Sequence, residues 1–225
     1  MIEKISPTIE DYLGILYILE RDGEIISGVR LAALLGVSQP TVTNTLKRML
    51  RDGLISMELP GGTALTPKGL EAASSVMRRH MLAEWMLSRM LSWSKVHQEA
   101  HQMEHAISDE LEAALLDQLN QPTLCPHGNP LPGNEDLVKD WIPIHLFQIG
   151  DHIIIRRIHE LAEEQPEVLD FLERNLIGIN TVVTVEEVLT FNQTITIRVG
   201  NHPVTIGFPL ARSIFAEYAP EPVVD

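Results

Sequence analysis

The sequence predicts a mainly α-helical chain that ends in a small β domain. Three observations support this prediction. Apolar residues recur at helical spacing through most of residues 7–119. Prolines and glycines then crowd residues 120–133. Beyond residue 142, short runs rich in Val, Ile and Thr alternate with turn signals, as is typical of strands.

The composition limits the classes of protein that the chain can be. It has 225 residues, of which 44% are hydrophobic, and no apolar run long enough for a membrane span. The N-terminal residues lack the apolar core of a signal peptide, and a single cysteine excludes an intramolecular disulfide. We therefore expect a cytoplasmic protein with no membrane partner.

The net charge of −14 disfavours a protein that coats nucleic acid. This charge is uneven, with −2 over residues 1–75, −5 over 76–141 and −7 over 142–225. The N-terminal third is therefore the part best suited to a polyanion.

The first 75 residues predict a winged helix-turn-helix domain. A helix is expected in "PTIEDYLGILYILERDG", followed by a short helix that ends at Gly36 and a second one that Ser38 caps. Two strand-like runs then flank Pro60-Gly61-Gly62, which indicates a hairpin.

A helix-turn-helix reads DNA with the start of its second helix. The residue types found there can bond base edges, and the cations that follow can reach phosphates. The candidate DNA-binding residues are Ser38, Gln39, Pro40, Thr41, Asn44, Lys47, Arg48 and Arg51. The alternatives are that Ser38 only caps the helix, that the cations are merely solvated, and that the winged helix contacts protein.

Residues 76–141 predict a helical domain. One long helix follows Thr66-Pro67, and a second begins in "KVHQEAHQMEHAISDE" and continues to about Leu119. An ordered loop, "NQPTLCPHGNPLPGNED", closes the region because its prolines exclude regular structure. Apolar residues in these helices predict a dimer surface or, alternatively, a core shared with the β domain: Trp85, Leu91, Trp93, Ile107, Leu111 and Leu115.

The second of these helices carries a candidate metal-binding face. At 100° per residue, His101, Glu104 and His105 lie at about 40°, −20° and 80° from His97. Glu99 lies on the opposite side, so the stretch does not match the H-E-x-x-H motif of zinc proteases.

Further candidate ligands lie outside this helix. His80 and Glu84 share a face of the preceding helix, and the stiff "CPHG" segment adds Cys125 and His127. A lone histidine is usually structural. So many histidines and glutamates at these spacings favour metal binding.

Residues 142–225 predict the β domain. "DHIIIRRI" is strand-like, "EEQPEVLDFLERNLI" is helical, and "TVVTVEEVLTFNQTITIRVGNHPVTIGF" contains several short strands. Turns are expected at Asn192 and at Gly200-Asn201.

Five segments follow one another along the chain: "TIEDYL", "SQPTVTNTLKRMLRDGLI", "RRHMLAEWML", "KVHQEAHQMEHAISDEL" and "CPHGNPLPG". With these segments in this order, the chain resembles the diphtheria toxin repressor family, which includes manganese transport regulators. The resemblance covers the whole chain. It implies a DNA-binding repressor rather than an enzyme, with a winged helix-turn-helix, a metal-binding and dimerisation domain and an SH3-like β-barrel domain. A homodimer would bind palindromic operator DNA.

The resemblance also implies two metal sites. The regulatory site would contain Asp11, His101, Glu104 and His105. The ancillary site would draw its ligands from a larger set, in which Glu163, Glu164 or Glu167 could replace the last member: His80, Glu84, His97, Cys125, His127 and Glu160.

Some positions depart from the family pattern. His101 stands where iron-type members have Cys, and Gly14 stands where some manganese regulators have a carboxylate. Oxygen and nitrogen ligands suit Mn²⁺, with Fe²⁺ as the alternative and Zn²⁺, Co²⁺ or Ni²⁺ as surrogates. Because Asp11 belongs to the DNA-binding domain, a bound ion would fix the orientation of that domain on the next one.

Two other functions compete with this interpretation. A metal-dependent hydrolase would need a general base beside the His/Glu cluster, and Glu99 faces away from it. A metal-independent winged-helix regulator would leave the histidine face unexplained.

Overall fold

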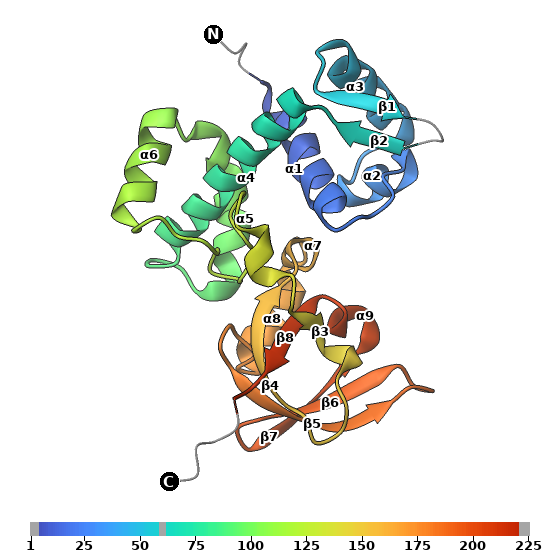
Figure 1. Cartoon of the computed structure of the whole chain (residues 1–225), viewed down its shortest axis with the longest axis vertical. Helices are drawn as coiled ribbons and strands as arrows, with labels where there is room; N and C mark the ends of the chain where they lie inside the picture. The colour runs from blue at the N-terminus through green and yellow to red at the C-terminus, as the bar shows by residue number, and fades with distance from the viewer. Residues whose placement is uncertain (1–4, 59–61, 221–225) are drawn as a thin grey trace. The chain divides into compact units, whose positions relative to one another are not determined.

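The computed structural model describes residues 5–58 and 62–220 and confirms a helical chain that ends in a small β domain (Figure 1). The chain divides into two compact units, each described by itself. The first unit comprises residues 1–80 and 103–108, and the second comprises residues 81–102 and 109–225. Among the described residues, no helix combines the length and apolar character needed to cross a membrane.

The first unit contains the expected helix-turn-helix and wing. Its elements are α1 (Pro7–Arg21), α2 (Gly28–Leu34), α3 (Gln39–Arg51), the antiparallel strands β1 (Ile55–Glu58) and β2 (Gly62–Leu65), and the beginning of α4 (Pro67–Leu87). The turn between α2 and α3 includes Gly36 at φ +63°, where a glycine is least strained. Pro60 and Gly61 of the predicted hairpin turn lie outside the described residues.

Helix α1 is deeply buried. Every residue from Tyr12 to Leu19 is buried. The wing lies along α1, where Glu20 Oε2 accepts a 2.9 Å hydrogen bond from the N–H of Leu65. A Cβ on Gly14 would lie 3.4 Å from Met77 Sδ of α4, so α1 and α4 pack closely. Elements on more than one side therefore bury this helix.

The single helix expected from Lys95 to Leu119 was wrong. Helix α5 (Val96–Met103) ends early, a 3-10 turn spans Glu104–Ala106, and Ile107 is extended before α6 (Asp109–Gln118). No glycine or proline marks this break. Ile107 is buried, and the acidic residues that follow favour a new helix N-terminus. Tertiary burial thus outweighs the helical propensity of the stretch.

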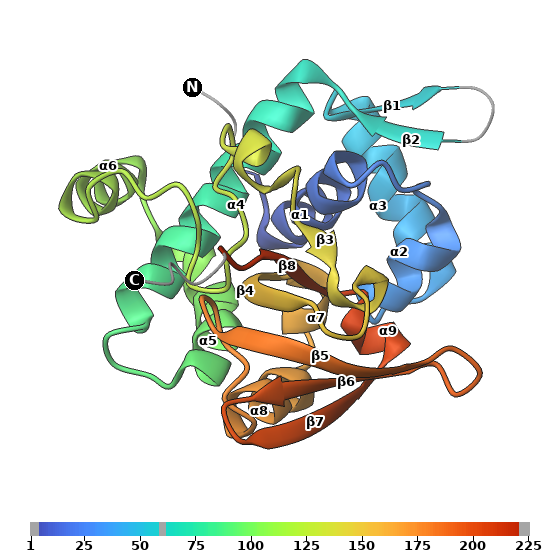
Figure 2. The same ribbon diagram turned by 60° about the horizontal axis from the view of Figure 1, so that its bottom comes forward.

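The β domain is an antiparallel six-stranded sheet with the order β3-β8-β4-β5-β6-β7, which matches the expected SH3-like domain. Figure 2 shows β5, β6 and β7 side by side. The strands are β3 (Ile142–Pro143), β4 (His152–Ile158), β5 (Val182–Leu189), β6 (Thr194–Val199), β7 (His202–Gly207) and β8 (Ile214–Tyr218), and the helices are α7 (Glu160–Glu163), α8 (Pro166–Arg174) and α9 (Phe208–Ala211).

The helical part of the second unit shares a core with the β domain. Leu169 and Leu172 of α8 are buried among the strand residues, and Trp93 packs against the same cluster. The hydroxyl of Ser94 donates a 2.6 Å hydrogen bond to Glu173. Trp93 therefore belongs to a core shared with the β domain, which was the alternative to a dimer surface. Leu91 and Leu111 remain exposed.

Candidate metal centres

The first candidate centre lies in the first unit, between α1 and the 3-10 turn. Nε2 of His105 lies 3.3 Å from Asp11 Oδ1 and 3.7 Å from Glu104 Oε1. One ligand atom from each of these residues lies within 4.8 Å of the others. Helix α1 thus supplies one carboxylate, and a segment about 90 residues later supplies a carboxylate and an imidazole. Two carboxylates and one imidazole fit a divalent cation that favours oxygen and nitrogen.

Two more side chains complete this cluster. Nδ1 of His80, a predicted ancillary ligand, lies 2.6 Å from Oε2 of the buried Glu104. Nδ1 of His105 lies 2.6 Å from Glu10 Oε2. Sequence reasoning did not single out Glu10, although it directly precedes Asp11. Neither its spacing nor its residue type marks it, because the contact depends on where the 3-10 turn lies.

His101 is exposed on α5 and belongs to the second unit. The angles that grouped it with Glu104 and His105 in the sequence analysis assumed one regular helix. Because α5 ends at Met103, the ideal angles do not apply to the two later residues.

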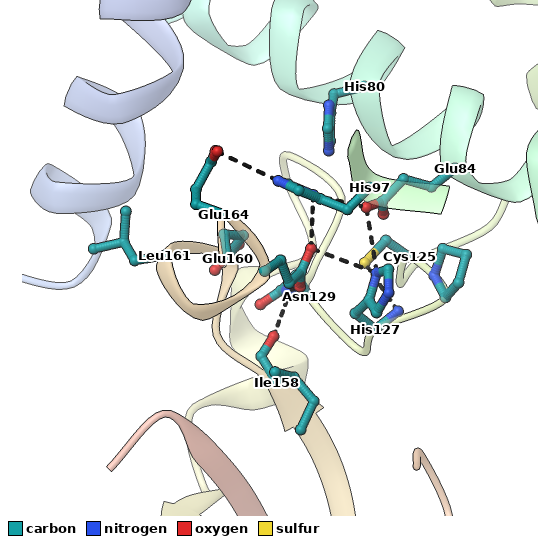
Figure 3. A network of polar contacts seen from close by, with 12 residues as sticks. His80, Glu84, His97, Cys125, His127, Asn129, Ile158, Glu160, Leu161 and Glu164 are labelled. Carbon is teal, nitrogen blue, oxygen red and sulfur yellow. Dashed lines mark hydrogen bonds and ion pairs between the residues drawn. The ribbon is translucent and has the colours of Figure 1, made fainter. Parts of the chain in front are cut away.

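The second candidate centre lies wholly in the second unit. Figure 3 shows Glu84 of α4, His97 of α5 and the loop residues Cys125 and His127 gathered together. Glu84 Oε1 lies 3.1 Å from His97 Nδ1 and 3.3 Å from His127 Nδ1. Glu84, Cys125 and His127 offer ligand atoms within 4.8 Å of one another, and all four residues are buried.

The loop that carries Cys125 and His127 is closely folded. Leu124 and Pro130 form an antiparallel bridge, and the N–H of Cys125 donates to the carbonyl of Asn129 at 2.8 Å. Gly128 has φ +85°, and a Cβ there would lie 2.0 Å from the carbonyl oxygen of Arg156. Only glycine fits this position without displacing the loop.

The β domain contributes a carboxylate to this centre. Glu163 Oε2 lies 3.0 Å from His97 Nδ1 and 3.4 Å from His127 Nδ1. Glu164 Oε1 lies 3.4 Å from His97 Nε2, and Glu167 is exposed. Glu160, the residue selected from the sequence, instead accepts a 2.9 Å hydrogen bond from Arg157. The contacts to the histidines therefore come from the next turn of the chain.

A buried network supports Glu163. The amide of Asn129 donates to Glu163 and, at 2.7 Å, to the carbonyl of Ile158. Its oxygen accepts a 2.5 Å hydrogen bond from Arg157. Since the guanidinium can only donate, it fixes the orientation of the Asn129 amide, which then presents its N–H groups to Glu163.

The electrostatics of this centre suit a cation. Burial lowers the pKa of His97, but hydrogen bonds to Glu163, Glu164 and Glu84 outweigh it and raise the pKa well above its ordinary value. Burial also raises the pKa of the Cys125 thiol, and the charges of Glu84 and Glu163 add to this effect. Cys125 therefore becomes a thiolate most readily when a cation offsets those carboxylates.

His127 provides a direct test of fit. Its Nε2 lies 3.1 Å from the carbonyl oxygen of Trp93, which can only accept, so Nε2 carries a proton. Its buried Nδ1 lies 3.3 Å from Glu84 Oε1 and 3.4 Å from Glu163 Oε2. In the neutral imidazole with its proton on Nε2, the lone pair of Nδ1 faces the carboxylate oxygens of Glu84 and Glu163. This arrangement fits a metal ion placed among them.

The candidate DNA-reading face lies on α3. Val42, Leu46 and Met49 are buried, and the opposite side of the helix is open. Ser38 caps the helix by accepting from the N–H of Thr41 at 3.3 Å. The exposed residues include all eight candidates: Ser38, Gln39, Pro40, Thr41, Asn44, Lys47, Arg48 and Arg51.

Comparison with known proteins assigns the family. Residues 4–62 match the N-terminal DNA-binding domain of iron-dependent repressors, and residues 66–133 match their metal-binding and dimerisation domain. The iron-dependent repressor IdeR of Mycobacterium leprae is 34% identical over 223 residues, which cover 93% of this chain and 96% of that protein. The chain belongs to the diphtheria toxin repressor family. It is a metal-dependent transcriptional repressor, as the sequence motifs indicated.

Other similar proteins include a manganese regulator as well as iron-dependent repressors. The diphtheria toxin repressor of Corynebacterium diphtheriae is 42% identical over 132 residues, which cover 58% of each chain. The solved structure of the manganese regulator SloR has a TM-score of 0.79 at 28% identity and covers 96% of this chain and 100% of its own. ScaR with bound Cd²⁺ has a TM-score of 0.80 at 28% identity and covers 93% and 99%. This repressor thus shares its fold with manganese regulators and is 34% identical to an iron-dependent repressor.

Proposed function

We propose that this repressor binds operator DNA as a homodimer in the cytoplasm when Mn²⁺ occupies the first centre. The observation that carries the proposal is the cluster of Asp11, Glu104 and His105, whose ligand atoms lie within 4.8 Å of one another. Asp11 lies on α1 of the DNA-binding domain. The other two residues lie within the range that matches the metal-binding and dimerisation domain.

The connectivity of the chain explains how this centre would act as a switch. Asp11 and Glu104 repel each other when both are ionised, and a divalent cation supplies the charge that offsets this repulsion. The 3-10 turn at Glu104–Ala106 continues directly from α5 and leads into α6. Holding that turn against α1 therefore constrains the dimerisation helices through the backbone. Coupling of this kind is reciprocal, so operator DNA should also tighten metal binding.

The ligand types favour Mn²⁺ at the first centre. Asp11, Glu104 and His105 offer oxygen and nitrogen only, and His101, the fourth ligand that the family resemblance implies, would add a second nitrogen. Carboxylates suit Mn²⁺, whereas thiolates favour softer ions. Fe²⁺ is the alternative, because the relatives named above include iron-dependent repressors. Zn²⁺, Co²⁺ and Ni²⁺ are expected to act as surrogates in vitro.

We propose the second centre as an ancillary site that joins the helical region to the β domain. Its ligands would be Glu84, His97, Cys125, His127 and Glu163. The contacts of Glu163 with both histidines favour it over Glu160, which is engaged by Arg157. His80 is reassigned in this proposal to the first centre, where it contacts Glu104.

The DNA contacts of the proposal rest on α3. Its exposed first turn would read base edges in the major groove, and its later cations would contact phosphates. Substituting Thr41 by Ala should change sequence preference by about 1–3 kcal/mol if a base contact is lost. A uniform loss of affinity across sequences would instead make Thr41 a phosphate-positioning residue.

The decisive experiment combines metal with DNA. A duplex is selected from a random pool with the Mn²⁺-loaded protein, and binding is then measured at fixed salt with Mn²⁺ or a chelator. Glu104→Ala should abolish Mn²⁺-dependent binding, while Glu71→Ala, which removes an exposed carboxylate of α4, should not. Unchanged affinity in Glu104→Ala at saturating Mn²⁺ would refute the role of the first centre. Repeating the titration with Fe²⁺ under anaerobic conditions distinguishes the two metals.

A further inference from the structure

His105 contacts α1 through both of its ring nitrogens. Nδ1 lies 2.6 Å from Glu10 Oε2, and Nε2 lies 3.3 Å from Asp11 Oδ1. The two carboxylates are adjacent in sequence yet face different edges of one imidazole. Glu10 and His105 are both largely shielded from solvent. The Glu10 contact is therefore a defined feature of the cluster and not a loose surface pair.

The two contacts differ in what they allow chemically. A carboxylate can only accept a hydrogen bond, so Nδ1 of His105 carries the proton in its bond to Glu10. Nε2 is the nitrogen that faces Asp11 and Glu104. For Nε2 to serve as a ligand, its lone pair must point to the ion and the single ring proton must remain on Nδ1. The bond to Glu10 favours that tautomer over the other.

Glu10 itself lies on the wrong side of the ring to be a ligand. The group of residues that converge within 4.8 Å includes Asp11, Glu104 and His105 but not Glu10. Its carboxylate is occupied with the far edge of the imidazole. In metal sites, a carboxylate in this place typically orients the histidine and increases its basicity.

We propose that Glu10 is a positioning residue of the regulatory centre, which holds His105 in the Nδ1-protonated tautomer and aims Nε2 at Asp11 and Glu104. The inference rests on the proposed function, because it assumes that His105 is a metal ligand. It adds a residue that touches no metal but sets the affinity of the centre. Losing such a partner typically costs about 10–100-fold in metal affinity.

Calorimetric titration of the full-length protein with Mn²⁺ tests the proposal. Glu10→Ala should weaken binding at the first centre by about 10–100-fold. Glu10→Gln, whose amide oxygen still accepts from Nδ1–H, should retain affinity within about threefold. Glu71→Ala removes the same charge from an exposed position and should have no effect. Unchanged affinity in Glu10→Ala, or an equal loss in Glu10→Gln, would overturn the positioning role.

Two further measurements separate this inference from others. In a His105→Ala background, Glu10→Ala should cause no additional loss, because the residues act as one unit; an additive loss would show that Glu10 acts independently. The Co²⁺–thiolate absorption of Cys125 reports the second centre and should be unchanged by Glu10→Ala, whereas its loss would indicate general unfolding and overturn the proposal. If Glu104→Ala and His105→Ala themselves leave Mn²⁺ affinity intact, the proposed function fails first.

Discussion

Replacing Gly128 by Ala should disrupt the second centre far more than replacing Gly133 by Ala. Both glycines lie in the loop around Cys125 and His127, at φ +85° and +94°. Alanine at a left-handed backbone position costs about 1–2 kcal/mol. A Cβ on Gly133 meets nothing within 4 Å, so this backbone cost is the whole effect expected there.

Gly128 carries a second cost. A Cβ there would lie 2.0 Å from the carbonyl oxygen of Arg156 and 2.9 Å from the Cα of Arg157. These are backbone atoms of β4, so they cannot rotate away as a side chain could, and the loop must move instead. Overpacking of this kind adds about 1–3 kcal/mol. The total expected loss for Gly128→Ala is therefore about 2–5 kcal/mol.

Urea denaturation of the chelator-treated variants measures this difference. Tryptophan fluorescence is a suitable probe because the Trp93 ring lies 4.7 Å from the His127 ring. Displacement of the loop should also weaken Co²⁺ binding at Cys125, seen as reduced thiolate absorption. Equal losses of unfolding free energy in the two variants, with the Co²⁺ signal retained in both, would refute the reasoning.

Three other substitutions have defined outcomes. Ser38→Ala removes the N-cap of α3 and should cost about 1 kcal/mol in unfolding free energy, which Ser38→Asn should restore; equal stability of all three proteins would show that the cap contributes nothing. Gly69→Ala should lower the melting temperature, because its Cβ would lie 1.8 Å from the carbonyl oxygen of Leu54. Gly28→Ala should not, because a Cβ there would meet open space. Similar melting temperatures of the two variants would contradict this. Asn129→Asp keeps the oxygen that accepts from Arg157 but loses both donated hydrogen bonds. It should therefore lower the unfolding free energy of the chelator-treated protein by about 1–3 kcal/mol and weaken Co²⁺ binding. Wild-type values of the unfolding free energy and of Co²⁺ affinity would refute the role of the network.

The sequence predicted the order of elements because each has a strong local signal. Ser38 marks the start of α3, the run of three isoleucines marks β4, and the alternation of threonine and isoleucine marks β6. Local signals failed where packing decides. The break at Ile107 has no glycine or proline to announce it, and the two-residue strand β3 depends entirely on its pairing with β8.

The candidate ligands show the same division. Helical spacing selected Glu104 and His105 from the sequence, and the family resemblance added Asp11. The three lie together in the structure. For the carboxylate that the β domain gives to the ancillary site, the family resemblance left four candidates: Glu160, Glu163, Glu164 and Glu167. Spacing alone could not separate Glu160 from Glu163, since both are buried on the four-residue helix α7.

The sequence by itself determined the fold class, the family and the residue types available to bind metal, because these follow from local patterns and motifs. The tertiary structure decided which partner each side chain has. Arg157 engages Glu160 and, through Asn129, supports Glu163, while Glu10 holds the far edge of His105. Such contacts join segments up to 95 residues apart. They depend on how those segments pack, and no periodicity along the chain records that information.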